Sequence, residues 1–143
     1  MNTLKDTSVL ILGLGDSGLA MARWCNAAGA RVTVADTRAA PPQLAALRAE
    51  CPTARCIHAE FAGSLVEGTD IRAVFKSPGL TPAQIAPVLG AAYDSGIWVG
   101  GELSLFIQGL ETLKASQTYG PQILAITGTN GKSTVTTLVG LML

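Results

Sequence analysis

A short apolar run that ends in a glycine-rich turn constrains the fold more than any other feature. Residues 8–12 are followed by Gly13-Leu14-Gly15-Asp16-Ser17-Gly18, which has the spacing G-x-G-x-x-G. In such a turn the first glycine permits the tight bend, the second lets a phosphate approach the backbone, and the third lets strand and helix pack closely. The order therefore predicts a buried parallel strand, followed by a helix whose first turn can bind a phosphate.

The alternation of apolar runs and helix-forming stretches continues to about residue 108. Further strands are predicted at residues 31–36, 55–58, 71–76 and 96–99, and helices at 17–28, 41–51, 82–95 and 102–108. Strands that alternate with helices are typical of an α/β fold in which a doubly wound parallel sheet is covered on both faces. We therefore expect a Rossmann-like domain, with Trp24 of the first helix in its core.

Motifs that follow two of the strands indicate a binding site. Asp36 ends the second strand, where dinucleotide-binding folds place an acid on a ribose, and Ser77-Pro78-Gly79 follows the strand at 71–76. Ligands of open α/β sheets bind beyond the carboxyl ends of the strands, where these residues and the glycine turn meet. Alone, Ser-Pro-Gly indicates only a turn. Together the motifs predict a nucleotide diphosphate ligand, and they leave NAD and UDP open.

A second phosphate-binding pattern lies further along the chain. Residues 122–127 predict a buried strand that leads into the loop 128–134, Gly-Thr-Asn-Gly-Lys-Ser-Thr, and then a helix. Backbone N–H groups at the turn and the helix start can hold a polyphosphate, Lys132 adds a positive charge, and Ser133 offers a hydroxyl to Mg²⁺. The loop departs from the strict pattern, because Ile126 stands where the first glycine belongs. ATP and Mg²⁺ are the predicted ligands.

Charge and apolar content argue against several other classes. The 143 residues carry 10 basic and 10 acidic side chains, which gives no electrostatic reason to bind nucleic acid or an acidic membrane. No apolar run approaches the roughly 18 residues of a membrane span, and the N-terminus has no secretory-signal pattern. Three cysteines without CxxC spacing favour reduced thiols and a cytoplasmic location. The lone His58 is expected to be solvated or hydrogen-bonded rather than a metal ligand.

The motifs together resemble the Mur ligases, and within that family the D-glutamate-adding branch. Two nucleotide loops in this order carry the resemblance, with Ser77-Pro78-Gly79 and Gly101-Glu102-Leu103 between them. Its most specific parts are residues 127–134 and the turn Asp36-Thr37-Arg38 before Pro41-Pro42. The resemblance implies that the first domain binds a UDP-muramoyl substrate and not NAD, with residues 36–38 around the uracil.

The resemblance also implies roles for individual residues. The implied substrate-binding residues are Gly15, Asp16, Ser17, Asp36, Thr37, Arg38, Ser77, Pro78 and Gly79. The implied ATP-binding residues are Gly128, Thr129, Asn130, Gly131, Lys132, Ser133 and Thr134. Among these, Lys132 is the implied catalytic residue, and Ser133, with Thr134 beside it, is the implied Mg²⁺ ligand.

An ATP-dependent amide-forming reaction follows from the same resemblance. The alanine carboxylate of UDP-N-acetylmuramoyl-L-alanine would attack the γ-phosphate to give an acyl phosphate, and the amine of D-glutamate would then displace phosphate, in peptidoglycan precursor synthesis. Residues 109–121 are polar and carry turn formers, which indicates a linker. On either side of it, the resemblance implies a UDP-substrate domain at 1–108 and the start of a central ATPase domain at 122–143. The alternatives are an NAD-binding Rossmann oxidoreductase and a regulatory nucleotide-binding module.

Family members continue through a complete ATPase domain and an amino-acid-binding domain. We therefore expect this chain to be an N-terminal portion that forms no amide bond by itself. Its last strand and helix would leave apolar surface uncovered, so we expect the C-terminal segment to be mobile, to dock on the first domain or to mediate self-association.

Overall fold

Five parallel strands form one sheet in the order β3-β2-β1-β4-β5. The computed structural model describes residues 4–117 and 119–142. The strands are β1 (Ser8–Leu12), β2 (Arg31–Asp36), β3 (Arg55–His58), β4 (Ile71–Lys76) and β5 (Trp98–Gly101). The helices are α1 (Asp16–Ala27), α2 (Leu44–Glu50), α3 (Pro82–Asp94), α4 (Glu102–Gln117) and α5 (Lys132–Met142), with a 3₁₀ helix η1 (Gly63–Leu65). The predicted doubly wound, Rossmann-like sheet is confirmed.

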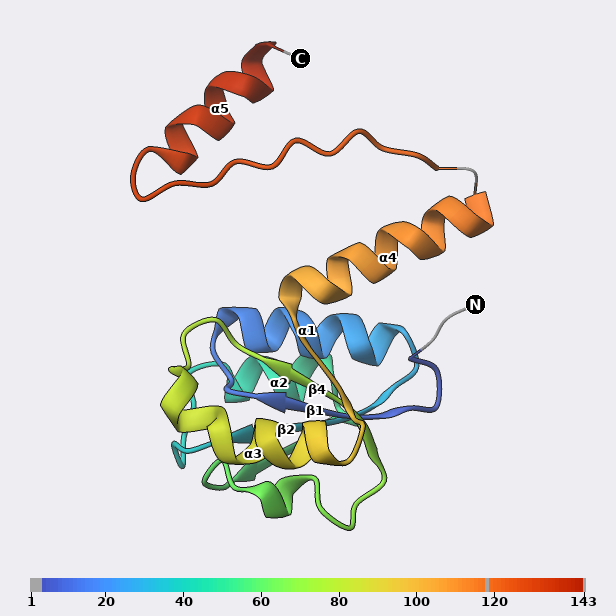
Figure 1. The fold of residues 1–143 in the computed structure, drawn as a ribbon, viewed down its shortest axis with the longest axis vertical. Helices are drawn as coiled ribbons and strands as arrows, with labels where there is room; N and C mark the ends of the chain where they lie inside the picture. Colours follow the sequence, from blue (N-terminus) through green and yellow to red (C-terminus); the bar gives the residue numbers. More distant parts are fainter. Residues whose placement is uncertain (1–3, 118, 143) are drawn as a thin grey trace.

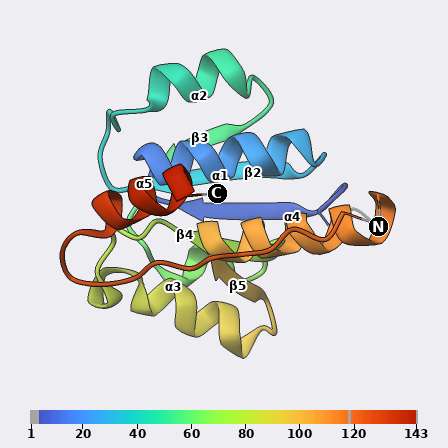
Figure 2. The same ribbon diagram turned by 90° about the horizontal axis from the view of Figure 1, so that it is seen from above.

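Helices cover both faces of the sheet, and each face has its own core (Figures 1 and 2). Successive side chains of a strand point to opposite faces, so the fully buried β1 contributes to both. Val9 and Ile11 pack with α1, α2 and Leu105 of α4. Leu10 and Leu12 pack with α3 and the segment around η1. The apolar strand pattern therefore reflects burial on two sides, as in other parallel sheets.

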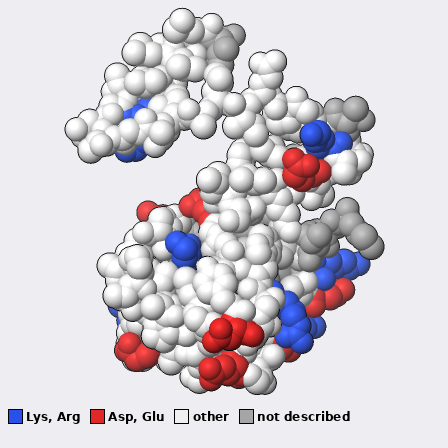
Figure 3. All heavy atoms as spheres, in the orientation of Figure 1, with Lys and Arg blue, Asp and Glu red and all other residues white. Residues whose placement is uncertain are grey.

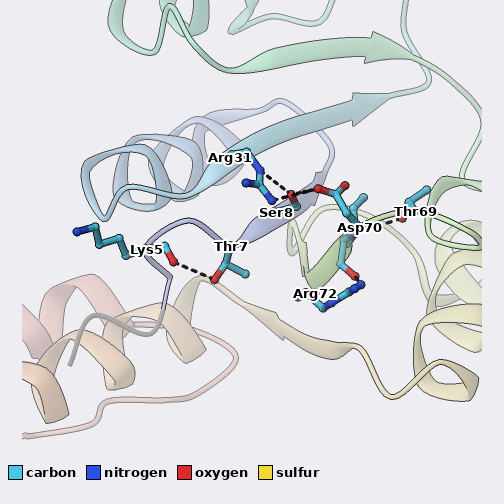
Figure 4. Close-up of polar contacts among 8 residues, drawn as sticks. Lys5, Thr7, Ser8, Arg31, Thr69, Asp70 and Arg72 are labelled. Carbon is cyan, nitrogen blue, oxygen red and sulfur yellow. Dashed lines mark hydrogen bonds and ion pairs between the residues drawn. The ribbon is translucent and has the colours of Figure 1, made fainter.

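A polar cluster joins three strands at the amino edge of the sheet, the edge where β1 begins (Figure 4). The Ser8 hydroxyl donates to Asp70 Oδ2 at 2.6 Å, and the Arg31 guanidinium donates to both Ser8 Oγ, at 3.0 Å, and Asp70 Oδ2, at 3.1 Å. The hydrogen bond from Ser8 is the main reason that the pKa of Asp70 lies below its usual value. This cluster ties the starts of β1 and β2 to the residue before β4.

The segment after β5 differs from its prediction. The helix predicted at 102–108 continues as α4 to Gln117, so the predicted helix was too short and the segment predicted as a linker, 109–121, is helical over residues 109–117. Glu102 in the first turn and Lys114 in the last turn complement the helix dipole, which favours the longer helix. Gly109 in its middle is tolerated because it packs against α1. A Cβ there would lie 2.5 Å from the Trp24 ring.

Trp24 and the predicted last strand also require correction. Trp24 was expected in the core, but it is 46% exposed beside α4. Residues 122–127 are not a strand, and most of their side chains are exposed. A strand needs a neighbour that pairs with its N–H and C=O groups, and no strand pairing involves this segment in the described residues. The segment is extended and leads to α5, which has no buried residue (Figure 1).

Candidate functional site

A cleft of about 450 Å³ lies at the carboxyl edge of the sheet, as expected for this fold. It collects residues from the glycine turn, the end of β2 and the turn after β4. All nine predicted substrate residues line it: Gly15, Asp16, Ser17, Asp36, Thr37, Arg38, Ser77, Pro78 and Gly79. Their binding role stays a prediction, but the fold brings them to one place.

The glycine turn is fastened at several points. The Gly13 N–H donates to the Ala35 carbonyl at 2.8 Å, and Gly13 has φ +83°, which other residues rarely adopt. The buried Ser77 hydroxyl donates to the Gly13 carbonyl at 3.1 Å, which links β4 to the turn. A Cβ on Gly18 would lie 2.0 Å from that carbonyl oxygen. Gly13 and Gly18 are therefore required by the packing of the turn itself.

Gly15 and Gly79 have no such structural requirement. A Cβ on either residue would meet no heavy atom within 4 Å, and neither has a positive φ. Both residues nevertheless line the cleft. The lack of a side chain at Gly15 leaves room for a ligand to approach the backbone at the start of α1, which is the function of the second glycine in a phosphate-binding turn. Gly79 leaves similar room in the turn after β4.

Asp36 uses its whole acceptor capacity inside the protein. Its Oδ2 accepts from the Leu14 N–H at 2.7 Å and from Arg38 Nη2 at 2.7 Å. Its Oδ1 accepts from the Arg38 N–H at 2.9 Å and from Arg38 Nε at 2.8 Å. A carboxylate has about four lone-pair sites, so none remains for a ligand. Asp36 therefore positions the glycine turn and Arg38 rather than contacting a ribose.

Asp36 is ionised beside Arg38, because its pKa is lowered. Hydrogen bonds from the Arg38 side chain lower the pKa of Asp36 from 3.8 to about 2, against burial, which raises it, while the Leu14 and Arg38 N–H groups lower it further. The Asp36 side chain is only 3% exposed, whereas that of Arg38 is 53% exposed. Arg38 spends two of its five N–H donors on Asp36, so the remaining donors can serve a ligand.

Two further contacts fix the rim of the cleft. Gln43 donates from Nε2 to Asp16 Oδ1 at 2.6 Å, which orients a carboxylate in the first turn of α1. His58 Nε2 lies 3.0 Å from the Thr37 carbonyl oxygen, so the expectation of a hydrogen-bonded histidine is confirmed. Neither contact partner, Gln43 or His58, was predicted to serve the site.

Four other cleft residues escaped the sequence analysis as candidate ligand contacts: Gly13, Phe61, Leu80 and Gln84. Phe61 lies in an irregular segment after β3 and has no motif. Gln84 did have a signal, because Thr81 and Gln84 have the spacing of a capping box, and Gln84 Oε1 accepts from the Thr81 N–H at 2.9 Å. That bond fixes Gln84 in the first turn of α3, beside the cleft.

A second cavity of about 540 Å³ adjoins the cleft through Pro78. Its lining includes Lys76, Glu102, Leu103 and Phe106, where β4 and β5 end and α4 begins. Lys76 and Glu102 are charged, whereas Leu103 and Phe106 are apolar. On the face of the molecule seen in Figure 3, acidic and basic groups are scattered among uncharged ones. The cleft therefore continues into a roomier, partly apolar space.

The second predicted site stands apart from the cleft. Residues 128–131 form a turn before α5, Lys132 is the first residue of that helix, and all residues from 127 to 134 are exposed. Gly131 has φ +76°, and Lys132 Nζ donates to the Gly128 carbonyl at 2.6 Å. A helix start with a lysine beside it suits an anionic polyphosphate. No Asp or Glu follows Glu111 in the sequence, so Ser133 and Thr134 offer Mg²⁺ only hydroxyls.

Residues 4–117 and 119–142 also bear on metal binding, membrane insertion and thiol reactivity. That part of the chain holds no group of three or more His, Cys, Asp or Glu side chains able to bind a metal ion. No described helix is both long and apolar enough to cross a bilayer. Cys25, Cys51 and Cys56 are free, and burial raises the pKa of the Cys25 thiol to about 12, so that thiol is unreactive near neutral pH.

Two known proteins similar to the chain carry the same name. A UDP-N-acetylmuramoylalanine–D-glutamate ligase from Albidiferax ferrireducens is 64% identical over 99% of the chain, and one from Ralstonia nicotianae is 53% identical over 96%. The chain spans about 28% of the length of each relative. D-lactate dehydrogenase from Escherichia coli shares the fold alone, with 20% identity, a TM-score of 0.50, and coverage of 78% of this chain and 35% of the enzyme.

A family model described as Mur ligase MurD-like, N-terminal domain, matches residues 7–101, which contain the whole sheet and the cleft. The resemblance seen in the motifs is thereby confirmed. The chain belongs to the MurD-like Mur ligases, of which it contains the N-terminal domain.

Proposed function

We propose that the cleft binds the UDP part of UDP-N-acetylmuramoyl-L-alanine, and that the chain is the N-terminal part of an ATP-dependent ligase that adds D-glutamate to it through an acyl phosphate. Family membership and the names of the relatives support the reaction. The observation that carries the binding proposal is the pair of open glycines, Gly15 and Gly79. Packing requires neither glycine, whereas a diphosphate at the start of α1 requires Gly15.

The state of Asp36 favours UDP over NAD. NAD-binding domains use an acid at the end of the second strand to accept hydrogen bonds from a ribose hydroxyl. Here all four acceptor sites of that acid are occupied by Leu14 and Arg38. A uracil ring, in contrast, presents carbonyl oxygens that need donors, and Arg38 and Thr37 line this end of the cleft with donors to offer. The adjoining cavity beyond Pro78 provides room for the sugar.

The loop at 128–134 would hold the ATP polyphosphate. Lys132 at the start of α5 would neutralise charge on the transferred phosphoryl group, which is how such reactions are chiefly catalysed. Ser133, with Thr134 beside it, would contribute to Mg²⁺ binding. Carboxylate ligands for Mg²⁺ and the D-glutamate site would come from outside residues 112–143, which contain no acid.

We assign residues 1–108 to the UDP-substrate domain, 109–121 to the connection and 122–143 to the start of the ATPase domain. The connection begins as helix, because α4 extends to Gln117. A cytoplasmic location is supported by the three free cysteines, since reducing compartments keep thiols unpaired.

Calorimetric titration tests the binding proposal. The chain should bind UDP-N-acetylmuramoyl-L-alanine and UDP, and it should show no binding of NADH under the same conditions. Gly15→Ala should weaken UDP binding at least about tenfold, because the new methyl group occupies the approach to the backbone. Preference for NADH, or a Gly15→Ala variant with unchanged affinity for UDP, would contradict the proposal.

A separate assay addresses ATP. The chain should bind ATP weakly, Lys132→Ala should remove that binding, and neither form should release ADP in response to D-glutamate and the UDP substrate. ADP release that depends on D-glutamate would show that residues 1–143 already contain a complete catalytic site.

A further inference from the structure

We infer that His58 is a positioning residue for the nucleoside base, and that it makes the cleft select uracil over cytosine. The inference rests on the proposed function and extends it to a residue outside the glycine turn and outside the lining of the cleft. It starts from the contact between His58 and the backbone of the turn that follows β2.

The end of β3 is fastened to that turn by two hydrogen bonds. In the sheet Asp36 is the register partner of His58, and the Ala59 N–H donates to the Asp36 carbonyl at 3.1 Å. One residue further, His58 Nε2 lies 3.0 Å from the Thr37 carbonyl oxygen. A carbonyl oxygen only accepts, so His58 must carry its proton on Nε2 and donate it. The imidazole thus continues the strand pairing beyond the last backbone contact.

This contact completes a clamp on a single peptide group. The Thr37 carbonyl and the Arg38 N–H belong to the same planar unit. Its carbonyl is held by His58, and its N–H donates to Asp36 Oδ1 at 2.9 Å. With both ends held, rotation of the plane is opposed, which fixes the backbone from which the Thr37 and Arg38 side chains extend. Both residues line the cleft, and the Arg38 guanidinium is itself held by Asp36.

Fixed donors at this position distinguish pyrimidines. Uracil presents an oxygen acceptor at the ring position where cytosine presents an amino donor. Donors of Arg38 and Thr37 that are held in place can hydrogen-bond to the uracil oxygen, but they would face the cytosine amino group donor to donor. A site built on such hydrogen bonds strongly rejects an analogue that cannot form them. If the peptide plane could rotate, the donors would adapt and the discrimination would fall. His58 therefore acts through Thr37 and Arg38 and touches no ligand itself.

The test compares UDP with CDP by calorimetry in the wild-type chain and in three variants. His58→Gln keeps an amide N–H donor near the position of Nε2. The side chain of His58→Asn is too short for its amide to reach the Thr37 carbonyl oxygen, and His58→Ala removes the donor. We expect the wild type and His58→Gln to prefer UDP, and the preference to fall about five- to tenfold in His58→Asn and His58→Ala, as for one lost hydrogen bond.

Two controls separate this role from a structural one. Thr53→Val removes another exposed side-chain hydrogen bond, to Asn26 at 2.9 Å, and should leave both affinities unchanged. Thermal unfolding should show that the His58 variants remain folded at the titration temperature. A uniform loss of affinity for UDP and CDP would indicate a general structural effect and overturn the inference.

The remaining outcomes are also decisive. Equal behaviour of His58→Gln and His58→Asn would overturn the inference, as would a wild type that binds UDP and CDP equally well, while UDP binding itself would still support the proposed function. A wild type that binds neither nucleotide would refute the proposed function, and the inference with it.

Discussion

The negative charge of Asp36 stabilises the folded state, because its hydrogen bonds with Arg38 form in the folded turn. Its pKa falls from 3.8 to about 2, so this contribution to stability is complete above pH 4 and is lost as the pH falls toward 2. The shift corresponds to about 2 kcal/mol. We expect Asp36→Asn to be less stable than the wild type near pH 6, and the gap in unfolding free energy to shrink between pH 4 and 2. Urea unfolding at several pH values measures it, and a gap that is constant with pH would refute the assignment.

Substitution by alanine should affect stability at Gly18 and ligand affinity at Gly15. Gly18→Ala forces a Cβ against the Gly13 carbonyl oxygen, so the turn and α1 must separate, at a cost of about 1–3 kcal/mol or more. Gly15→Ala meets no protein atom and loses only a modest N-cap preference, which costs less than about 1 kcal/mol. Thermal unfolding should therefore show a lower unfolding temperature for Gly18→Ala than for Gly15→Ala. Among variants that remain folded, UDP titration should show the loss of affinity in Gly15→Ala. Equal stability losses in the two variants would contradict this division.

For single residues, the glycine-rich motif predicted some roles and not others. The spacing of the glycines predicted which of them shape the turn and which one faces the ligand, because those roles depend on local geometry. The role of Asp36 was not predictable, since the number of donors around a carboxylate depends on the folded turn at Leu14 and Arg38. His58 was missed for the same reason, because its partner at Thr37 lies 21 residues away and is a backbone atom.

Helix α4 is held to the rest of the domain by few buried side chains. Only Leu105 is buried along its length, and Gly109 lets it approach the ring of Trp24 on α1. Gly109→Ala gains about 1 kcal/mol of helix propensity but pushes a methyl group into that ring. The ring is half exposed and can move outward, so we expect little change in stability and a red shift of Trp24 emission, measured in a Trp98→Phe background.

Gly140→Ala in α5 is the matched control for that experiment. A Cβ there meets nothing within 4 Å, so the substitution should raise helix content without any shift of the emission. Unchanged Trp24 emission in Gly109→Ala would show that α4 does not rest on the indole.

The strands of the sheet and the helix α5 were predicted to within a few residues, whereas the length of α4 and the strand at 122–127 were not. The central strands β1 and β4 have apolar patterns that match their burial, because helices cover both faces of the sheet there. The pattern at 122–127 is equally apolar, but no neighbouring strand pairs with it, so it remains extended. Apolar sequence indicates what can be buried, and only the presence of a partner decides whether a strand forms.

In the molecule as a whole, the apolar side chains of the C-terminal segment, residues 119–142, are largely exposed. Ile123, Leu124 and Leu141 are each more than 60% exposed, and α5 buries none of its side chains. We expect amides between residues 119 and 131 to exchange with solvent far faster than those of the sheet, and the chain to self-associate at high concentration. Hydrogen exchange and sedimentation measure the two effects, with Leu138→Ser/Leu141→Ser expected to reduce association. A monomer with full protection through Gly128 would contradict both expectations.

The position of β1 in the middle of the sheet has a consequence for the order of assembly. Ser8 pairs with Arg31 on one side and with Ile71 on the other, so the β2 side can close while β4 has still to be synthesised. While β4 and α3 are missing, Leu10 and Leu12 lack the part of their core that Val74, Ile85 and Val88 provide. Apolar surface exposed in this way makes a nascent chain prone to mispairing or to capture by chaperones. The glycine turn is complete only when Ser77 arrives to bind the Gly13 carbonyl, so the cleft is among the last features to mature.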